Sequence, residues 1–598
     1  MNTELIRNFA IIAHIDHGKS TLADRIMEQT ETISEREASD QLLDDMAVER
    51  EHGVTVKSRT VRNFYRADDG KEYEYNLIDT PGHVDFSYEV SKSLAACEGA
   101  ILLVDATQGV QAQTIANLRL ARKNKLAILP VINKIDSPAA DLERTEKQIR
   151  SLAPELEDAD ILYVSAKTGD GVHEVLEAVH TTIPAPSGDA STPLKALVFD
   201  SSYDPYQGVI AYLRVIDGTL GESQNIKAMA SKQTLQNNEI GVFAPGQTPV
   251  KTLGLGEVGY VKTGVKDPTQ LRVGDTITDS SHPATKALPG YEPAHPMVFA
   301  GFYPKGDTYR ELELAVEKLS LNDSSFQYVK ENSDALGPGF RCSFLGIFHL
   351  QIIRERLKNE YGLDVLTTAP NVTYRVHMKG SETVNEVDSP STFPDYGEID
   401  YVEEPFSNAV ITTDEQELNA VMQLAEKHMG TLTDIANEGD LITVTYHIPT
   451  AEIAYDFFNT LKSISHGYAT LETQFADYGM ADVVKVELDV NYAPVDALAF
   501  IIHRQDAPAK TQALVEKLKY TIPRRLYPMP VQAMVEGRVL ARVDVPPLRK
   551  NAAVSGEKKS ISKKQALLRR QSINKRQAAK SDIKLPQEVF DAVLELSM

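Results

Sequence analysis

The sequence predicts a multidomain fold of mixed α/β and β architecture, and three observations lead to this prediction. The chain has 598 residues, several times the ~150 residues of a single domain. Its first part alternates apolar strand runs with amphipathic helices, which is the pattern of a parallel sheet. A strand-rich segment follows, and two later segments repeat the order strand, helix, two strands, helix, strand. We therefore divide the chain into five domains and a linker.

Residues 1–186 form the first predicted domain. Its strand candidates are 9–13, 77–79, 101–105, 127–132 and 161–164. The apolar spacing over 172–179 predicts a helix with one core-facing side. Asp68-Asp69-Gly70 lies between apolar runs and predicts a hairpin turn, which adds an antiparallel edge strand. The Pro-rich stretch 184–188 cannot continue a helix and ends the domain.

The remaining predicted domains contain more strand. Residues 187–289 are β-rich, with turns at 217–218 and 274–275, and a small barrel is the natural packing. Two ferredoxin-like α+β modules are expected at 290–378 and 403–480, joined by a linker at 379–402. Their expected helices are 309–319, 350–361, 416–428 and 452–463. The last domain, 481–598, has strands, a helix near 510–520 and a basic tail.

Composition narrows the class of protein. Two cysteines, Cys97 and Cys342, cannot form a disulfide framework for so long a chain, and the N-terminus has no secretory leader. The longest apolar runs are shorter than the ~18 residues of a membrane span. We expect a cytoplasmic protein and leave open a peripheral association with the cell membrane. The net charge of −23 argues against indiscriminate nucleic-acid binding.

Residues 13–21 read Ala-His-Ile-Asp-His-Gly-Lys-Ser-Thr, directly after a predicted strand and before a predicted helix. Backbone N–H groups of such a loop bind phosphate oxygens, Lys19 would reach the β and γ phosphates, and the Ser20 hydroxyl would bind Mg²⁺. The loop residues expected to bind a nucleotide are Asp16, His17, Gly18, Lys19, Ser20 and Thr21. A zinc site at His14 and His17 is the alternative, but no further ligand string lies nearby.

The string Asp79-Thr80-Pro81-Gly82-His83 predicts the γ-phosphate side of the site. Asp79 would hold Mg²⁺ through water, and Gly82 would present its N–H to the γ phosphate. Thr55 is the candidate second Mg²⁺ hydroxyl, although an ordinary strand threonine explains it equally well. His83 is the candidate catalytic residue, because an imidazole there can orient the attacking water. A surface or core histidine is its alternative interpretation.

Two further strings predict recognition of guanine. Asp136, in Asn133-Lys134-Ile135-Asp136, can accept hydrogen bonds from the ring N–H and the exocyclic amine of guanine, donors that adenine lacks at these positions. The residues expected around the base are Asn133, Lys134, Asp136, Ser165, Ala166 and Lys167. A simple turn with a capping aspartate is the alternative. Together the strings predict a site for GTP or GDP with Mg²⁺ rather than for ATP.

These strings resemble those of the translational GTPases, and the domain series resembles elongation factor G without its extra tip domain. The strings at 340–349, 548–551 and 585–588 match the elongation factor 4 (LepA) family, with the BipA family as a close alternative. The resemblance implies a P-loop GTPase domain, a translation-factor β-barrel, two ferredoxin-like modules and a LepA-type C-terminal domain. It also implies that His83 acts on the ribosome, that Ile15 and Val54 form an apolar gate, and that Asp16 helps to bind a monovalent cation such as K⁺.

The implied function is a ribosome-dependent GTPase that remodels or back-translocates transfer RNA, with the 70S ribosome and transfer RNA as partners and a monomer off the ribosome. A GTP-gated ribosome assembly or binding factor is the alternative from another class. Between 549 and 580 the tail has eleven Lys and Arg against one acid. Its expected RNA contacts are Arg549, Lys550, Lys563, Lys564, Arg569, Arg570, Lys575 and Arg576. A solvated charged helix is the alternative.

The chain departs from the family pattern at two places. The usual Lys-Cys-Tyr-Gly-Gly-Asp string after 548–551 is replaced by the residues 552–559, and His52 stands where the family usually has arginine before the switch glycine. We therefore expect a divergent member or a second paralogue, for which GTP hydrolysis is a firmer expectation than the detailed C-terminal contact.

Overall fold

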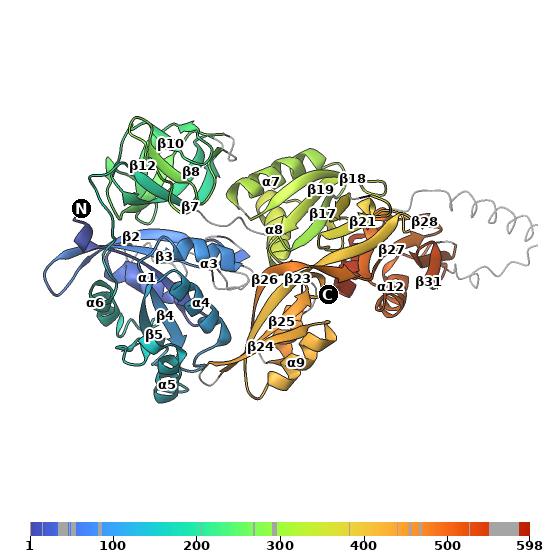
Figure 1. The fold of residues 1–598 in the computed structure, drawn as a ribbon, viewed down its shortest axis with the longest axis horizontal. Helices are drawn as coiled ribbons and strands as arrows, with labels where there is room; N and C mark the ends of the chain where they lie inside the picture. Colours follow the sequence, from blue (N-terminus) through green and yellow to red (C-terminus); the bar gives the residue numbers. More distant parts are fainter. Residues whose placement is uncertain are drawn as a thin grey trace, which may run out of the picture.

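The structure is a computed structural model of the chain. It describes residues 2–14, 16–33, 46, 48–49, 55–81, 86–204, 206–266, 270–289, 296–323, 325–381, 383–438, 441–453, 457–465, 469–525, 527–548 and 585–597. Figure 1 shows five units that follow one another along the sequence. We call them the N-terminal unit, the barrel, the first module, the second module and the C-terminal unit. This arrangement confirms the predicted fold class.

The N-terminal unit is a six-stranded sheet between two layers of helices. Its strands are β1 (Ile6–Ala13), β2 (Arg59–Arg66), β3 (Glu72–Asp79), β4 (Gly99–Asp105), β5 (Ala127–Asn133) and β6 (Leu162–Tyr163), in the order β2-β3-β1-β4-β5-β6. All neighbours are parallel except β2 and β3. Its helices are η1 (Thr3–Leu5), α1 (Lys19–Gln29), α3 (Ser87–Leu94), α4 (Ala112–Lys123), α5 (Leu142–Leu152), η3 (Pro154–Leu156) and α6 (Val172–Thr182).

Apolar side chains on the two faces of this sheet form separate cores. One core includes Phe9, Leu22 and Val175, and the other includes Ile12, Leu102 and Leu118. A parallel sheet covered on both faces requires strands that are apolar throughout, which is why β1 and β4 read as continuous apolar runs. The carboxyl ends of β1, β3, β4 and β5 consequently meet at one edge.

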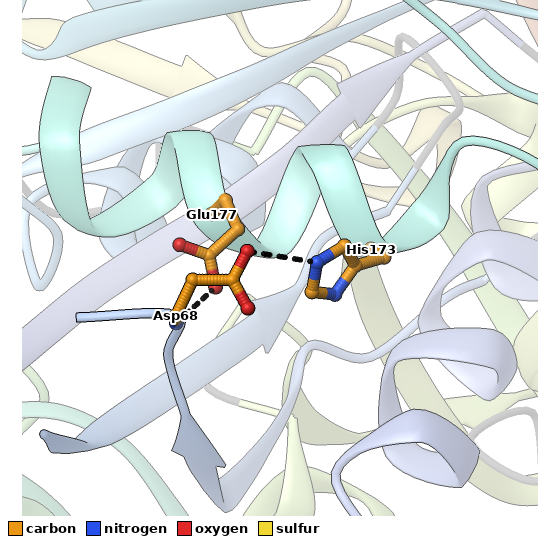
Figure 2. Close-up of side chains that lie close together, drawn as sticks. All are labelled: Asp68, His173 and Glu177. Carbon is orange, nitrogen blue, oxygen red and sulfur yellow. Dashed lines mark hydrogen bonds and ion pairs between the residues drawn. The ribbon is translucent and has the colours of Figure 1, made fainter. Parts of the chain in front are cut away.

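The predicted hairpin turn joins β2 to β3, and a polar cluster ties it to α6. Figure 2 shows Asp68 beside His173 and Glu177. His173 Nε2 lies 3.4 Å from Asp68 Oδ2, and the Asp68 N–H donates to Glu177 Oε1 at 3.0 Å. Tyr65 donates its hydroxyl proton to the same Glu177 oxygen at 2.6 Å. The cluster therefore connects the edge hairpin to a helix of the unit.

The barrel is an eight-stranded sheet with the order β11-β10-β16-β7-β8-β15-β12-β13, and β14 pairs with β9 beside it. Its strands are β7 (Lys195–Asp204), β8 (Gly208–Asp217), β9 (Leu220–Gly221), β10 (Ile226–Ala228), β11 (Thr234–Leu235), β12 (Glu239–Phe243), β13 (Gln247–Pro249), β14 (Thr252–Leu253), β15 (Val258–Lys262) and β16 (Thr276–Asp279). One apolar core, with Leu213 and Ile277 among its members, fills the interior. Phe199 and Val258 belong instead to a core of the N-terminal unit, so the two units pack together.

The first module has the predicted order strand, helix, two strands, helix, strand. Its elements are β17 (Val298–Pro304), α7 (Tyr309–Asn322), β18 (Gln327–Ser333), β19 (Gly337–Phe344), α8 (Ile347–Tyr361) and β20 (Val365–Thr367). The sheet order is β18-β19-β17-β20. Leu312 and Leu319 of α7 and Leu350 and Ile353 of α8 share one core with the strands, which explains the apolar periodicity of both helices.

The second module contains more of the chain than the sequence predicts. Its elements are β21 (Tyr374–Met378), β22 (Val384–Val387), η5 (Pro390–Thr392), β23 (Ile399–Asp414), α9 (Leu418–Lys427), β24 (Thr431–Glu438), β25 (Leu441–Pro449), α10 (Thr450–Glu452), α11 (Phe458–Ile464) and β26 (Thr470–Ala481). The predicted linker 379–402 carries β22 and the start of β23, and β21 pairs with both. These strands add to the module's edge because Tyr374, Val376, Val387 and Val402 bury their side chains together.

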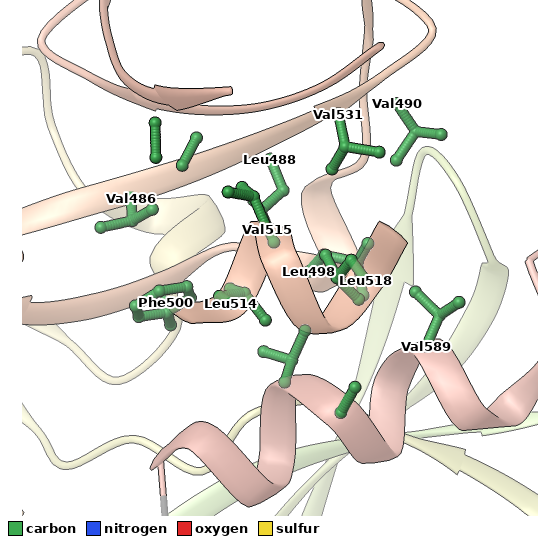
Figure 3. Packing of buried hydrophobic residues seen from close by; sticks show 14 of the residues in the cluster. Val486, Leu488, Val490, Leu498, Phe500, Leu514, Val515, Leu518, Val531 and Val589 are labelled. Carbon is green, nitrogen blue, oxygen red and sulfur yellow. The ribbon is translucent and has the colours of Figure 1, made fainter. Parts of the chain in front are cut away.

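The C-terminal unit combines a small sheet with two helices. Its elements are β27 (Val483–Val490), β28 (Ala493–Pro494), η7 (Asp496–Leu498), β29 (Phe500–His503), α12 (Ala507–Thr521), β30 (Met529–Val535), β31 (Arg538–Val545) and α14 (Gln587–Ser597). Figure 3 shows Leu514, Val515 and Leu518 of α12 between the sheet and Val589 of α14. Helix α14, beyond the basic tail, was not among the predicted elements.

No helix within the described ranges has the length and apolar character needed to cross a membrane.

Candidate nucleotide-binding site

The loop between β1 and α1 has backbone conformations that few residues tolerate. Gly18 precedes α1 with a φ of 90°, and a Cβ there would lie 2.4 Å from Asn133 Nδ2. Asp16 is also left-handed, with a φ of 64°. Asn117 of α4 donates to the Ala13 carbonyl at 3.2 Å. The loop is thus held at its start and at its end, in front of the N-terminus of α1, a position that favours anions.

Lys19, Thr55 and Asp79 meet beside this loop. Lys19 Nζ lies 2.6 Å from Asp79 Oδ1 and 2.8 Å from Thr55 Oγ1. The Thr55 hydroxyl donates to Asp79 Oδ2 at 3.5 Å. Asp79 is completely buried at the end of β3, and Ser20 lies in the first turn of α1. A carboxylate with two hydroxyls is an oxygen set suited to Mg²⁺, and the neighbouring ammonium suits phosphate.

His17 is a residue of this loop, and its imidazole is completely buried. The Asp105 N–H donates to His17 Nδ1 at 3.3 Å. Burial, together with the nearby His14, lowers the pKa of His17 to about 3, so the ring is neutral near pH 7. Two clusters of possible metal ligands occur among the described residues, and neither includes His14 or His17. The buried ring therefore holds the loop against the end of β4.

Asn133 connects the phosphate loop to the base end of the site. Its Nδ2 donates to the His17 carbonyl at 2.8 Å, and its Oδ1 accepts from the Ala166 N–H at 2.9 Å. Lys134 Nζ donates to the Asp16 carbonyl at 2.6 Å. These contacts bring the strings at 133–136 and 165–167 against the loop at 13–21, although more than a hundred residues separate them along the chain.

Asp136 projects from the end of β5 with an exposed side chain. The Ser165 hydroxyl donates to Asp136 Oδ1 at 2.7 Å, which fixes the carboxylate while leaving it open to solvent. Lys167 of the string 165–167 is also exposed. An oriented carboxylate at the rim can accept the two N–H donors of a guanine edge.

Comparisons with known proteins give matches along most of the chain. The family model for the elongation factor Tu GTP binding domain matches residues 4–185. The model for the elongation factor G C-terminus matches 401–488, and that for the GTP-binding protein LepA C-terminus matches 490–595. A Lactiplantibacillus plantarum protein named Elongation factor 4 2 is 62% identical over 100% of both chains. Elongation factor 4 of Bacillus subtilis is 48% identical over 99% of this chain and 97% of its own.

The chain belongs to the elongation factor 4 (LepA) family. It is therefore a translational GTPase, which binds and hydrolyses GTP. The match to the LepA C-terminus decides between this family and the BipA alternative. A solved structure of a Thermus thermophilus protein covers 80% of this chain and 97% of its own, with a TM-score of 0.58 and 18% identity, and supports the fold alone.

Two residues that position the site in this elongation factor 4 family member were missed by sequence reasoning. Asp105 forms an ion pair with Lys134 at 2.7 Å and accepts from the Thr107 N–H at 2.7 Å. Burial alone would raise the pKa of Asp105, but these hydrogen bonds outweigh it and lower the pKa. An aspartate directly after the apolar run 100–104, like Asp79 after its strand, was the signal available.

Arg25 of α1 is the second missed residue. Its guanidinium donates to the carbonyls of Ala166 and Lys167 at 3.0 and 3.2 Å. No local motif marks it, because its role depends on a contact with a loop about 140 residues later.

Several predicted site residues lie outside the described residues. They are Ile15, Val54, Gly82 and His83 around the phosphates, and Arg549, Lys550, Lys563, Lys564, Arg569, Arg570, Lys575 and Arg576 in the basic tail.

Proposed function

We propose that this elongation factor 4 family member hydrolyses GTP in response to the ribosome and uses the reaction to remodel or back-translocate bound transfer RNA. The observation that carries the proposal is the convergence of Lys19, Thr55 and Asp79 beside the phosphate loop, in a chain that also has a LepA-type C-terminus. The first feature supplies the chemistry, and the second supplies the reason to expect a ribosomal partner.

In this proposal, different residues bind the phosphates, the base and the metal ion of the nucleotide. Lys19 binds the β and γ phosphates, and Asp136 accepts from the guanine edge. Ser20, Thr55 and Asp79 would hold Mg²⁺, which would offset negative charge on the phosphate oxygens. Asp16 contributes to a K⁺ site beside the phosphates.

His83 is the proposed catalytic residue. An imidazole that follows the γ-phosphate-sensing Gly82 can orient the attacking water and stabilise the charge that develops during phosphoryl transfer. Ile15 and Val54 form an apolar gate that keeps this imidazole away from the water until the ribosome repositions it.

The basic tail is the proposed contact with RNA. Eleven Lys and Arg against one acid between 549 and 580 give this segment a net positive charge on an otherwise acidic chain. Phosphate backbones attract such segments through counterion release. The protein is proposed to be a monomer off the ribosome.

The first experiment is a GTP hydrolysis assay with and without 70S ribosomes, with ATP as the control nucleotide. We expect strong stimulation that is specific to GTP and falls by about 10²-fold or more in His83→Ala, the scale of losing one group that stabilises a transition state. GTP binding without ribosome stimulation would contradict the proposal. That result would favour a GTP-gated assembly or binding factor, in which His83→Ala keeps its cellular function.

A further inference from the structure

Three units of the molecule meet at the side chain of Lys57. Its ammonium donates to the Ser201 carbonyl of β7 at 3.0 Å and to the Asn322 carbonyl at the end of α7 at 3.2 Å. The Asp200 carboxylate lies 3.6 Å away, and the ring of Tyr212 lies 5.9 Å away. A residue of the N-terminal unit thus binds the barrel and the first module at once.

The joint suits a cation. Asn322 is the last residue of α7, and the C-terminal carbonyls of a helix carry partial negative charge. Burial alone would lower the pKa of Lys57, but Asp200, Tyr212 and Glu89 together outweigh this effect and raise the pKa, so the lysine stays charged. The same asparagine accepts from the Tyr203 N–H at 2.8 Å through its side chain. Strand β7 and helix α7 are therefore in direct contact beside the Lys57 ammonium.

The segment that carries Lys57 also reaches the nucleotide site. Thr55, two residues earlier, accepts from Lys19. Between these ends the segment is clamped, because the N–H groups of Val56 and Lys57 both donate to Glu49 Oε1, at 3.0 and 3.2 Å. Glu49 is almost completely buried. Because the backbone between Thr55 and Lys57 is held by Glu49, a movement of Thr55 is expected to move Lys57 as well.

Apolar packing connects the same segment to the first module. Val48 and Val56 share a core with Phe86 and with Ile352 of α8. The rings of Phe86 and Phe348 meet edge to face, with centroids 6.0 Å apart. Phe86 follows the predicted phosphate-facing string 79–83 closely in the chain. Thus the segment that holds Thr55 and the residue Phe86, which follows the predicted phosphate-facing string, both contact the first module.

We infer that Lys57 is a positioning residue that couples the segment 55–57 to the joint between the barrel and the first module. Through this coupling, the bound nucleotide sets the relative orientation of these two units. By thermodynamic reciprocity, a partner that imposes this orientation changes the preference of the site between GTP and GDP by the same factor. The inference extends the proposed function, since it names the contact through which a ribosome-imposed domain arrangement reaches the nucleotide.

The test measures the distance between the two units by fluorescence energy transfer in the full chain. Labels are placed at Gly246→Cys in the turn after β12 and at Asn359→Cys on α8, both exposed positions. The native Cys97 and Cys342 are buried. The wild-type background is expected to change its transfer efficiency between GDP and a non-hydrolysable GTP analogue. Lys57→Met is expected to lose more than half of this change, and Lys57→Arg, which keeps the charge, to retain most of it.

Arg214→Met is the matched control. Arg214 of β8 pairs with Glu98 and so also joins the barrel to the N-terminal unit, but away from Thr55. Arg214→Met should keep the nucleotide-dependent change in transfer efficiency. This should hold even if Arg214→Met loses as much thermal stability as Lys57→Met. Lys57→Gln serves as a second variant if the methionine variant fails to fold.

Three outcomes would overturn the inference: no nucleotide-dependent change in the wild-type background, a full change in Lys57→Met, or an equal loss in Arg214→Met. Hydrolysis with ribosomes, assayed in parallel, separates the two proposals. A wild-type distance change that depends on Lys57, without ribosome stimulation, would refute the proposed function and leave the coupling in place.

Discussion

At the scale of single residues, Asp136 carries the proposed choice of base. Its carboxylate is held by Ser165 at 2.7 Å and faces solvent. Asp136→Asn replaces one acceptor oxygen with an N–H₂ donor, which would face the donors of guanine. We expect GTP affinity to fall by about 10²- to 10⁴-fold and binding of xanthosine triphosphate, which has a carbonyl in place of the amine, to improve. Titration calorimetry with both nucleotides measures the change.

The control for this substitution is Ser137→Ala, which removes a hydroxyl that accepts from the Ala139 N–H next to the site. It should leave both affinities nearly unchanged. Equal losses for GTP and xanthosine triphosphate in Asp136→Asn would show that the aspartate supports the loop rather than reads the base.

The residues that sequence reasoning found and missed differ in how their roles are encoded. Lys19, Asp79 and Asp136 stand in strings whose spacing alone indicates phosphate, metal and base. Asp105 and Arg25 support those strings through contacts made only after folding, with Lys134 and with the 165–167 loop. Their residue types are ordinary in their own elements, so nothing local distinguishes them from a solvated charge.

At the scale of elements, α12 carries the core of the C-terminal unit. Leu518 is completely buried among the strands and α14 (Figure 3). Leu518→Ala is expected to lower the free energy of unfolding of this unit by about 2–5 kcal/mol, because the lost methyl groups leave a cavity. Hydrogen exchange in α12, followed by mass spectrometry, reports the local loss. GTP hydrolysis without ribosomes should not change.

Gln512→Ala, at an exposed position of the same helix, is the matched control and should stay within about 0.5 kcal/mol of the wild type. Unaltered exchange in Leu518→Ala would mean that α12 does not carry the core of this unit.

Helices and strands were predicted correctly where the apolar periodicity is strong. They were missed where the pairing strand lies far away in the sequence. The strands of the N-terminal unit follow their apolar runs closely. In contrast, β21 and β22 read as a module end and a linker, because four to five residues with modest alternation do not reveal a partner such as β23. Helix α14 was missed although Val589, Val593 and Leu596 have helical spacing, because it follows the basic tail and its packing partner α12 lies much earlier in the chain.

At the scale of the whole molecule, the contacts between units were beyond sequence reasoning, since each joins side chains far apart in the chain. Lys57 meets Asn322, Arg119 of α4 meets Glu472 of β26 at 3.3 Å, and His503 of β29 meets two carboxylates of the second module. Length and composition predict only that the chain is acidic and folds into several domains. The order of domains limits which units can touch, but the charges that hold them are visible only in the folded protein.

The His503 contact predicts that the stability of the joint between the second module and the C-terminal unit depends on pH. His503 Nε2 lies 2.8 Å from Glu404 Oε1, and Nδ1 lies 3.2 Å from Glu452 Oε1. Glu452 also faces His428 at 3.0 Å and the cation of Lys510. Burial alone would lower the pKa of His503, but the two carboxylates outweigh it and raise the pKa to about 9. An imidazole that faces two carboxylates must donate from both nitrogens, which requires the protonated ring.

A folded-state pKa above the ordinary 6.5 stabilises the fold fully below pH 6.5, and this contribution is lost as the pH rises through about 9. The loss amounts to about 3 kcal/mol over that window. Because the chain has no Trp, Tyr527→Trp in the C-terminal core supplies a fluorescence reporter for urea unfolding. His503→Gln should remove most of the change in the free energy of unfolding between pH 6.5 and about 9. His447→Gln, which breaks the half-exposed pair with Asp477, should leave this change in place. The same slope in His503→Gln as in the parent would assign the pH dependence to other groups.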